Sequence, residues 1–168
     1  YTQVSAGDDF NCALRAGDGA VVCWGDESFS GASIPPAGAY TQVSAGDSHS
    51  CALRAGDGAV VCWGDNSNGQ TTAPPGAYAE VSAGSLFTCA LRAGDGALVC
   101  WGRNDNGEAT PPSGAYLQVD ASKSRHACAV RAGDRAVVCW GFNGSGQATP
   151  PEGAYTQVSA GNNHACAL

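Results

Sequence analysis

The stretch CALRAGDGAVVCWG, residues 51–64, decides the fold, because the chain repeats it almost letter for letter. The other copies occupy residues 12–25, 89–102 and 128–141. Each copy lies in a longer unit that opens on a tyrosine, and the units begin at residues 1, 40, 78, 116 and 155, so the period is 38 or 39 residues. A period in this range is typical of repeat architectures, in which neighbouring units bury a core that one unit cannot build alone.

Within one unit the sequence predicts short antiparallel strands and no helix. In the second unit, residues 50–54 and 59–63 are β-prone runs on either side of a Gly-Asp-Gly turn, which indicates a hairpin. Residues 40–46 form a third run that ends in small side chains, and residues 70–73 are a candidate weak outer strand before two prolines. We therefore expect an antiparallel sheet of three to four strands in each unit.

Sheets of this size at this period predict an all-β fold, a β-propeller whose blades stand radially around an axis. The Val-Ser-Ala-Gly run suits an innermost strand, because small side chains permit close backbone approach. A stacked β-solenoid is the alternative, although solenoids usually repeat over shorter periods. The prediction is one propeller domain, or part of one, with four complete repeats and a partial fifth, at residues 1–39, 40–77, 78–115, 116–154 and 155–168.

Composition excludes several classes of partner. The net charge of −7 argues against nucleic acid, because binding to phosphates needs a basic surface. No run of 18 apolar residues is present, so we expect no membrane span. The sequence contains no methionine, which indicates a processed start or a part of a longer product.

Nine cysteines follow the repeat. Ten residues separate the two members of each of four pairs, and adjacent strands of a hairpin bring such positions within disulfide reach. The prediction is four disulfides with Cys166 unpaired: Cys12–Cys23, Cys51–Cys62, Cys89–Cys100 and Cys128–Cys139. Free buried cysteines and zinc are the alternatives, although structural zinc prefers closer spacing and four ligands. Disulfides would place the protein in an extracellular, periplasmic or cell-surface location.

Two recurring motifs carry a family resemblance. The V-S-A-G-x-x-H-x-C-A-L run at residues 43–53, the C-W-G-x-N-x-x-G-Q run at residues 62–70 and their copies resemble the regulator of chromosome condensation repeat, in its cysteine-bearing bacterial and extracellular branch. The resemblance spans all 168 residues. It implies a propeller that serves as a protein-interaction scaffold. Members include a eukaryotic nucleotide exchange factor, a bacterial β-lactamase inhibitor and the extracellular part of plant receptor kinases.

No catalytic constellation stands out, since G-x-S-x-G, C-x-x-C and H-E-x-x-H are all missing from the sequence. We therefore predict no enzyme activity, no cofactor and no metal site. His49, His126 and His164 share one repeat position, which we interpret as a framework position. The loops at residues 65–69 and 104–107 superficially resemble calcium loops, but they lack the twelve-residue spacing and are interpreted as turns.

Positions that differ among the copies are candidates for recognition, because loops on a rigid scaffold commonly carry binding. They lie before the first cysteine and after the Cys-Trp-Gly of each unit, and we expect their aromatic members to be exposed. The candidate partner-binding residues are Asp9, Phe10, Phe29, His49, Leu86, Phe87, Arg103, Arg125 and Phe142. Unconstrained drift of the loops is the alternative interpretation.

The four tryptophans are constant among the copies, and we interpret Trp24, Trp63, Trp101 and Trp140 as packing between blades, with sugar binding as the alternative. The leading functional hypothesis is a non-catalytic extracytoplasmic scaffold that binds another protein through blade-end loops. One alternative is a structural subunit of an oligomer, filament or surface assembly, completed at the partial fifth repeat by copies of itself or by the rest of a longer propeller. The other is a secreted enzyme inhibitor of the β-lactamase-binding type.

Overall fold

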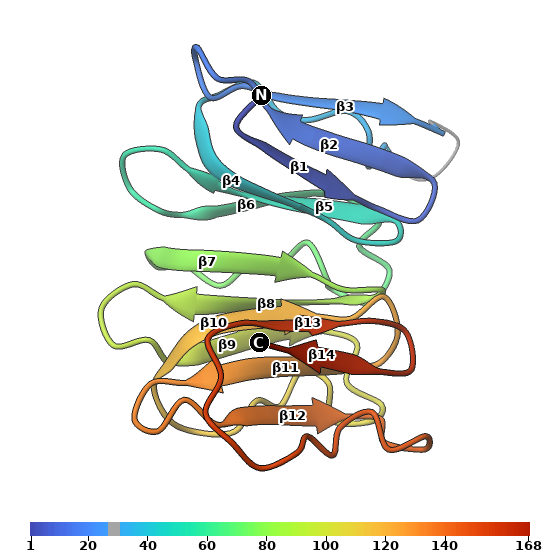
Figure 1. The fold of residues 1–168 in the computed structure, drawn as a ribbon. Coiled ribbons are helices and arrows are strands. Elements are labelled where there is room, and N and C mark those ends of the chain that lie inside the picture. Colours follow the sequence, from blue (N-terminus) through green and yellow to red (C-terminus); the bar gives the residue numbers. More distant parts are fainter. Residues whose placement is uncertain (27–30) are drawn as a thin grey trace.

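Strands and turns make up the part of the chain that the computed structural model describes, residues 1–26 and 31–168, and no helix occurs there. The strands form four sheets of three strands and one sheet of two, each with its strands in sequence order (Figure 1). This confirms the predicted all-β propeller, with four blades and a small fifth. Within the described ranges there is accordingly no helix long and apolar enough to cross a membrane.

Each three-stranded blade begins with an inner strand, continues with a middle strand and ends with an outer strand, and the two-stranded fifth sheet has an inner and a middle strand. The inner strands are β1 (Gln3–Ala6), β4 (Tyr40–Ala45), β7 (Tyr78–Ala83), β10 (Tyr116–Ala121) and β13 (Val158–Ala160). The middle strands are β2 (Phe10–Leu14), β5 (His49–Arg54), β8 (Phe87–Arg92), β11 (His126–Arg131) and β14 (Ala165–Ala167). The outer strands are β3 (Val21–Gly25), β6 (Val60–Gly64), β9 (Leu98–Gly102) and β12 (Val137–Gly141).

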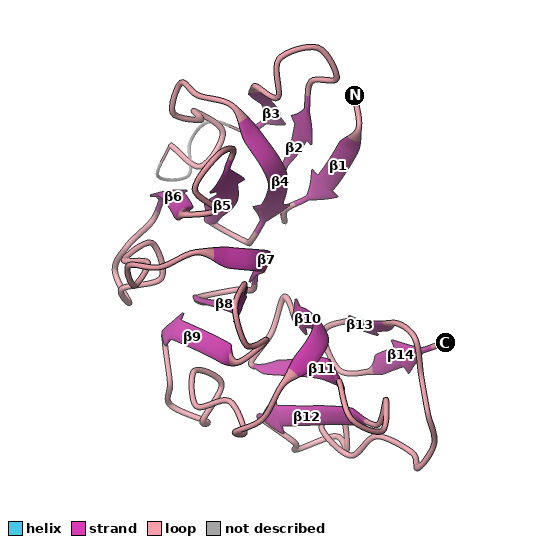
Figure 2. Ribbon diagram, turned by 90° about the vertical axis from the view of Figure 1, so that its left-hand side faces the viewer, coloured by secondary structure: helices cyan, strands magenta, loops and turns pink. Residues whose placement is uncertain are grey.

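The blades follow one another around an arc, with successive inner strands on its concave side (Figure 2). The hydrophobic core is therefore divided among the junctions between blades. In the junction between blades 1 and 2, for example, Phe10 and Leu14 of the first blade pack with Tyr40, Val43 and Trp63 of the second. A lone blade would leave this apolar surface in water, which is why the unit must repeat.

The cysteine pairs stand directly opposite one another on the middle and outer strands. Cys51 faces Cys62 in the register of β5 and β6, and their Cα atoms are 4.0 Å apart. The same pairing occurs in the other three-stranded blades, so all four predicted disulfides are confirmed: Cys12–Cys23, Cys51–Cys62, Cys89–Cys100 and Cys128–Cys139. Among the described residues Cys166 makes no disulfide, and it is exposed.

The expected fourth strand is absent from the second blade, where residues 70–73 form turn and coil. Side chains of the loop hold its backbone instead. Asn66 Oδ1 accepts a hydrogen bond from Thr71 N at 3.0 Å, and Gln70 Oε1 accepts one from Asn68 N at 2.9 Å. Asparagine and glutamine therefore supply partners that a neighbouring strand would otherwise provide.

Candidate functional site

The two ends of each blade differ in their loops. One end, which we call the hairpin end, holds the tight turns between middle and outer strands. The other, which we call the loop end, holds the inner-to-middle connections and the segments that leave the outer strands. These two sets of loops pair within each blade, since Arg103 N donates to Leu86 O at 2.9 Å and Phe142 N donates to Arg125 O at 2.8 Å. The sequence positions that vary among the copies therefore gather at the loop end.

Five of the predicted recognition residues are accessible at the loop end. Asp9 and Arg125 are exposed, Phe142 is 37% exposed, and Leu86 and Arg103 are partly exposed. Phe29 lies outside the described residues.

Three of the predicted recognition residues are buried: Phe10 is 2%, His49 0% and Phe87 1% exposed. The expectation that Phe10 and Phe87 are exposed was wrong. Each ring lies against a glycine three residues earlier, and a Cβ added to Gly84 would lie 2.7 Å from Cε1 of Phe87. The signal that could have revealed this burial is the constant three-residue spacing between glycine and ring.

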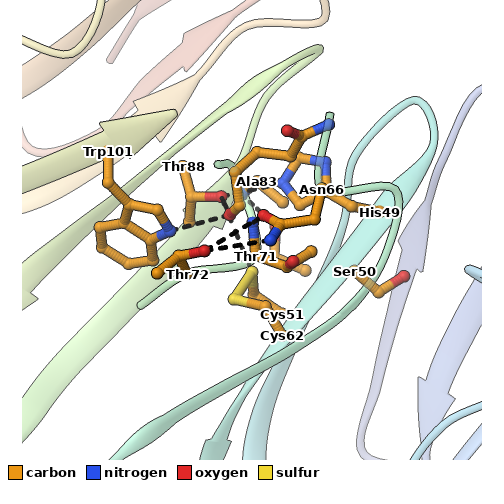
Figure 3. Close-up of a disulfide and its surroundings, with 12 residues drawn as sticks. His49, Ser50, Cys51, Cys62, Asn66, Thr71, Thr72, Ala83, Thr88 and Trp101 are labelled. Atoms are coloured by element: carbon orange, nitrogen blue, oxygen red, sulfur yellow. Dashed lines mark hydrogen bonds between the residues drawn. A yellow bond between two sulfur atoms is a disulfide. The ribbon is translucent and has the colours of Figure 1, made fainter. Parts of the chain in front are cut away.

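His49 joins two blades (Figure 3). Its Nε2 is 2.8 Å from Thr88 Oγ1 of the next blade, and burial lowers the pKa of His49 to about 4. His126 is equally buried, but neither ring nitrogen has a hydrogen-bond partner, and burial also lowers its pKa. His164 is exposed. These surroundings agree with a framework role for the two buried histidines.

Three tryptophans lie in the junctions, as predicted. The indole Nε1 of Trp101 donates to Gln70 O of the preceding blade at 2.8 Å, and Thr88 Oγ1 donates to the same carbonyl at 3.0 Å. Trp63 and Trp140 make the same contact with Ala32 O and Glu108 O. Trp24 differs, because its side chain is 47% exposed.

Neighbouring inner strands are joined by side chains. Gln3 Oε1 accepts from Val43 N at 2.9 Å, and Ser5 Oγ accepts from Ala45 N at 3.0 Å. We call this Gln-x-Ser pair the clasp. Equivalent bonds join Gln42 to Val81, Ser44 to Ala83, Ser82 to Ala121 and Gln118 to Val158. The clasp satisfies backbone N–H groups that would otherwise form an open sheet edge, and its residues line a central cavity of about 510 Å³.

Two clasp positions carry carboxylates. Glu80 replaces the glutamine of blade 3, and its Oε2 accepts from Val119 N at 3.0 Å. Asp120 replaces the serine of blade 4, and it accepts from Ala160 N at 2.7 Å and from Ser82 Oγ at 3.1 Å. Burial raises the pKa of Glu80 to about 7 and also raises the pKa of Asp120.

Lys123 reaches across the cavity at the loop end. Its Nζ donates to Ala45 O of β4, two blades away from its own. Burial lowers the pKa of Lys123, and the carboxylates of Asp47, Asp120 and Asp8 oppose that shift. Burial likewise raises the pKa of Asp47, against a hydrogen bond from Ser85 and the charge of Lys123. The carboxylates that act on Lys123 thus come from blades 1, 2 and 4.

Charge is distributed unequally between the two ends. At the hairpin end, each of the four three-stranded blades carries one ion pair between exposed side chains: Arg15–Asp18, Arg54–Asp57, Arg92–Asp95 and Arg131–Asp134. The other two charged side chains at this end, Arg135 and Glu152, carry opposite formal charges, so the formal charges of the hairpin end sum to zero. The other charged side chains in the described ranges lie at the loop end or along the cavity, and only three of them are cationic: Arg103, Lys123 and Arg125.

In the loop at residues 65–69, which resembles a calcium site, the aspartate oxygens accept hydrogen bonds from the loop itself. Asp65 Oδ1 accepts from Ser67 N at 3.0 Å, and Asp65 Oδ2 accepts from Gln70 Nε2 at 2.7 Å. In the part of the chain that the structure describes, no three His, Cys, Asp or Glu side chains form a group that could hold a metal ion.

The sequence of the repeat is similar to that of a known protein family. The family model described as "Regulator of chromosome condensation (RCC1) repeat" matches residues 1–30, 40–70 and 78–108. No curated protein matches the sequence.

Several solved structures have a fold similar to that of this chain. The CRINKLY WD40 ectodomain of the Arabidopsis thaliana receptor kinase ACR4 is 30% identical, with a TM-score of 0.81, and the match covers 100% of this chain and 59% of that one. The entire ectodomain of the Physcomitrella patens receptor kinase CR4 is 27% identical, with a TM-score of 0.82, over 100% of this chain and 47% of that one. Saccharomyces cerevisiae Prp20p, described with its binding properties to Gsp1p and histones, is 16% identical, with a TM-score of 0.78, over 99% and 55% of the two chains. This last likeness concerns the fold alone.

Proposed function

Because the chain belongs to the regulator of chromosome condensation (RCC1) repeat family, we propose that it is a non-catalytic, extracytoplasmic scaffold that binds another protein through the loop end of its blades. The similar chains are longer than this one, which spans 59% and 47% of the two receptor-kinase ectodomains. The proposal therefore concerns the surface that these residues form.

The observation that carries the proposal is the contrast between the two ends. The hairpin end repeats the same turn and the same ion pair from blade to blade, so it offers little that is distinctive to a partner. The loop end presents different accessible side chains in each blade, among them Asp9, Leu86, Arg125 and Phe142. Aromatic and arginine side chains are the types that dominate the energetics of protein interfaces.

Charge at the loop end suggests the chemistry of the partner. The described loops of blades 1 and 2 carry Asp8, Asp9, Asp26, Asp47 and Asp65 and no cation. The cations of this end all belong to blades 3 and 4. A partner that binds across the arc would therefore place basic groups over blades 1 and 2, because complementary charge steers association and fixes orientation.

Two findings support an extracytoplasmic location. Four disulfides are typical of proteins in an oxidising compartment. The receptor-kinase structures with similar folds are ectodomains. By the same family analogy, protein binding has a precedent in Prp20p, whose structure bound to Kap60 is known.

The experiment compares two triple variants of the disulfide-bonded chain. Leu86→Ala, Arg125→Ala and Phe142→Ala alter the loop end, whereas Arg54→Ala, Arg92→Ala and Arg131→Ala alter the hairpin end. Partners are crosslinked to the immobilised wild-type chain from the secreted fraction, identified by mass spectrometry and purified, and their dissociation constants are then measured. We expect the loop-end triple to weaken binding on the order of 100-fold, because interface hot spots contribute about 1–2 kcal/mol or more each.

The hairpin-end triple should leave the dissociation constant unchanged. A partner that loses affinity for the hairpin-end triple and keeps it for the loop-end triple would contradict the proposal. Circular dichroism of both triples must match that of the wild type, so that a loss of affinity reports the surface and not the fold.

A further inference from the structure

We propose that Asn143 is an acceptor site for an N-linked glycan at the loop end of blade 4. The tripeptide Asn143-Gly144-Ser145 follows the pattern Asn-x-Ser, with a residue other than proline in the middle, which is the acceptor pattern for N-glycosylation. No other asparagine of the sequence is followed by serine or threonine two positions later. The inference rests on the extracytoplasmic location proposed above, because this modification belongs to surface loops of secreted proteins.

The tripeptide lies where a glycan has room. It belongs to the segment that leaves the outer strand β12 (Figure 1), and all three of its residues are exposed. A bulky and hydrophilic chain attached to Asn143 would therefore extend into solvent, away from the apolar junctions between blades. Phe142 precedes the tripeptide, so the glycan would border the partner surface proposed above.

The folded loop uses only part of the hydrogen-bonding capacity of the Asn143 side chain. Its Oδ1 accepts from Ala148 N at 2.8 Å, and its Nδ2 donates to Thr149 Oγ1 at 2.9 Å. An amide NH₂ group carries two hydrogens, and glycosylation replaces one of them. The remaining N–H suffices for the bond to Thr149, so the loop has enough donors to keep its contacts when the glycan is attached.

The serine of the tripeptide is accessible as well. Ser145 N donates to Gln147 Oε1 at 2.8 Å, so the loop holds this residue by its backbone. Within the described ranges the Ser145 hydroxyl makes no hydrogen bond. This hydroxyl is the group that the acceptor pattern requires, and here it faces solvent instead of supporting the loop.

Blade 2 contains the same loop without the pattern. Asn66 Oδ1 accepts from Thr71 N at 3.0 Å, and Asn66 Nδ2 donates to Thr72 Oγ1 at 3.1 Å. Asn66 is exposed, as Asn143 is, but Asn68 occupies the position that corresponds to the serine. Asn68 N donates to Gln70 Oε1 at 2.9 Å, which is the bond that Ser145 makes in blade 4. The two loops therefore share their geometry and differ in the acceptor pattern.

The reaction joins Asn143 to an oligosaccharide that is supplied as a lipid pyrophosphate. A bond forms between Nδ2 and the anomeric carbon of the first sugar, and the bond from that carbon to the pyrophosphate oxygen breaks. The lipid pyrophosphate leaves with the electron pair of the broken bond, and Nδ2 gives up one proton. Nothing is oxidised or reduced, so the lipid-linked oligosaccharide and its transferase are the only other reactants.

The test directs the whole chain through the secretory pathway of a eukaryotic cell line. The intact mass of the secreted chain is measured before and after an amidase that removes N-glycans and leaves an aspartate in place of each modified asparagine. We expect the mass of one glycan, lost on amidase treatment, and a peptide map that places the new aspartate at position 143. Ser145→Ala should abolish the modification, because it removes the hydroxyl and keeps Asn143 with both of its loop bonds.

Asn68→Ser is the matched variant, since it gives Asn66 the acceptor pattern in the equivalent loop. It should add a second glycan, attached to Asn66. The masses before and after reduction also count the disulfides, which identifies folded chain. An unmodified Asn143 in the disulfide-bonded wild type would overturn the proposal, and so would a glycan that persists in Ser145→Ala. The wild-type measurement needs no variant to fold.

Failure of the glycan site and failure of the proposed location give different results. The cell line imposes the secretory compartment, so an unmodified Asn143 there contradicts the acceptor site alone. Reduced cysteines in chain isolated from its natural source would instead contradict the extracytoplasmic location.

Discussion

The junction between blades 2 and 3 and the junction between blades 3 and 4 share one design but differ in chemistry. In the first, His49 contacts Thr88 and Gln42 forms the clasp. In the second, a phenylalanine and an alanine occupy the positions of His49 and Thr88, and Glu80 forms the clasp. The backbone contacts are the same, so the difference between the two junctions lies in which side chains can gain or lose a proton.

The two junctions should therefore lose stability at opposite ends of the pH range. The pKa of His49 is lowered by burial to about 4, so its contribution to stability is present above pH 6.5 and is lost as the pH falls through about 4. The pKa of Glu80 is raised to about 7, so its contribution is lost as the pH rises. A repeat protein can thus place opposite pH limits in adjacent interfaces without changing its fold.

The largest expected effect comes from removing a disulfide, a feature that both junctions share. The Cys51–Cys62 and Cys89–Cys100 disulfides each span a sequence separation of 11 residues. Replacing either pair by alanine should cost about 3 kcal/mol of unfolding free energy, because each bridge closes a loop of the same length. Denaturant titration of the two double variants checks this. A difference well above 1 kcal/mol between them would mean that the side chains of the junctions, and not the loops, set the cost.

The next largest effect is a loss of stability at low pH that only the junction containing His49 should show. His49→Phe gives the first junction the ring that the second already has at Phe87. At pH 5 the wild type should lose about 2 kcal/mol of the stability that it has at pH 7 through His49, and the variant should not, because phenylalanine binds no proton. Unfolding midpoints measured at both pH values test this expectation.

The reverse variant is the matched control. Phe87→His places a buried imidazole opposite Ala127, where no hydroxyl is present. It should gain the acid sensitivity that His49→Phe loses. An unchanged difference between pH 5 and pH 7 in both variants would show that the buried ring at this position does not control acid stability.

Much of this framework could be predicted from the sequence, because it depends on short-range patterns. The hairpin of residues 51–64 places Cys51 and Cys62 opposite each other, and the constant Cys-Trp-Gly indicates a packed tryptophan. The prediction of a fourth strand was wrong, because it relied on short-range β propensity alone. The side chains of Asn66 and Gln70 satisfy their own loop, and β propensity does not report such bonds.

The candidate site was harder to predict, because it depends on contacts between blades. Alternation along a strand separates two faces, but it does not say which face meets a neighbouring blade. Phe10 and Phe87 were therefore assigned to the surface although they are buried. The clasp was missed as well, since Gln42 and Val81 are 39 residues apart and nothing local joins them.

A smaller effect compares two tryptophans. Trp101→Phe removes the donor to Gln70 O, but Thr88 still donates to that carbonyl. Trp140→Phe removes the donor to Glu108 O, where alanine replaces the threonine. We expect costs of about 1 kcal/mol for the first variant and about 2 kcal/mol for the second, because a buried carbonyl without a partner carries a desolvation penalty. Equal costs in denaturant titration would show that the second donor at the first junction is unimportant.

The smallest expected effect lies at the hairpin end, where the two junctions do not differ. Arg54 pairs with Asp57 and Arg92 pairs with Asp95, and all four side chains are about half exposed. The arginine hydrogen bonds hold the pKa of each aspartate at about 2. Arg54→Ala and Arg92→Ala should each return the neighbouring carboxyl toward 3.8, as followed by NMR, while the unfolding midpoint at pH 7 stays unchanged, because solvent screens exposed ion pairs. A lower midpoint in one variant alone would mean that the hairpin ends also distinguish the junctions, and the chemical contrast would then extend beyond His49 and Glu80.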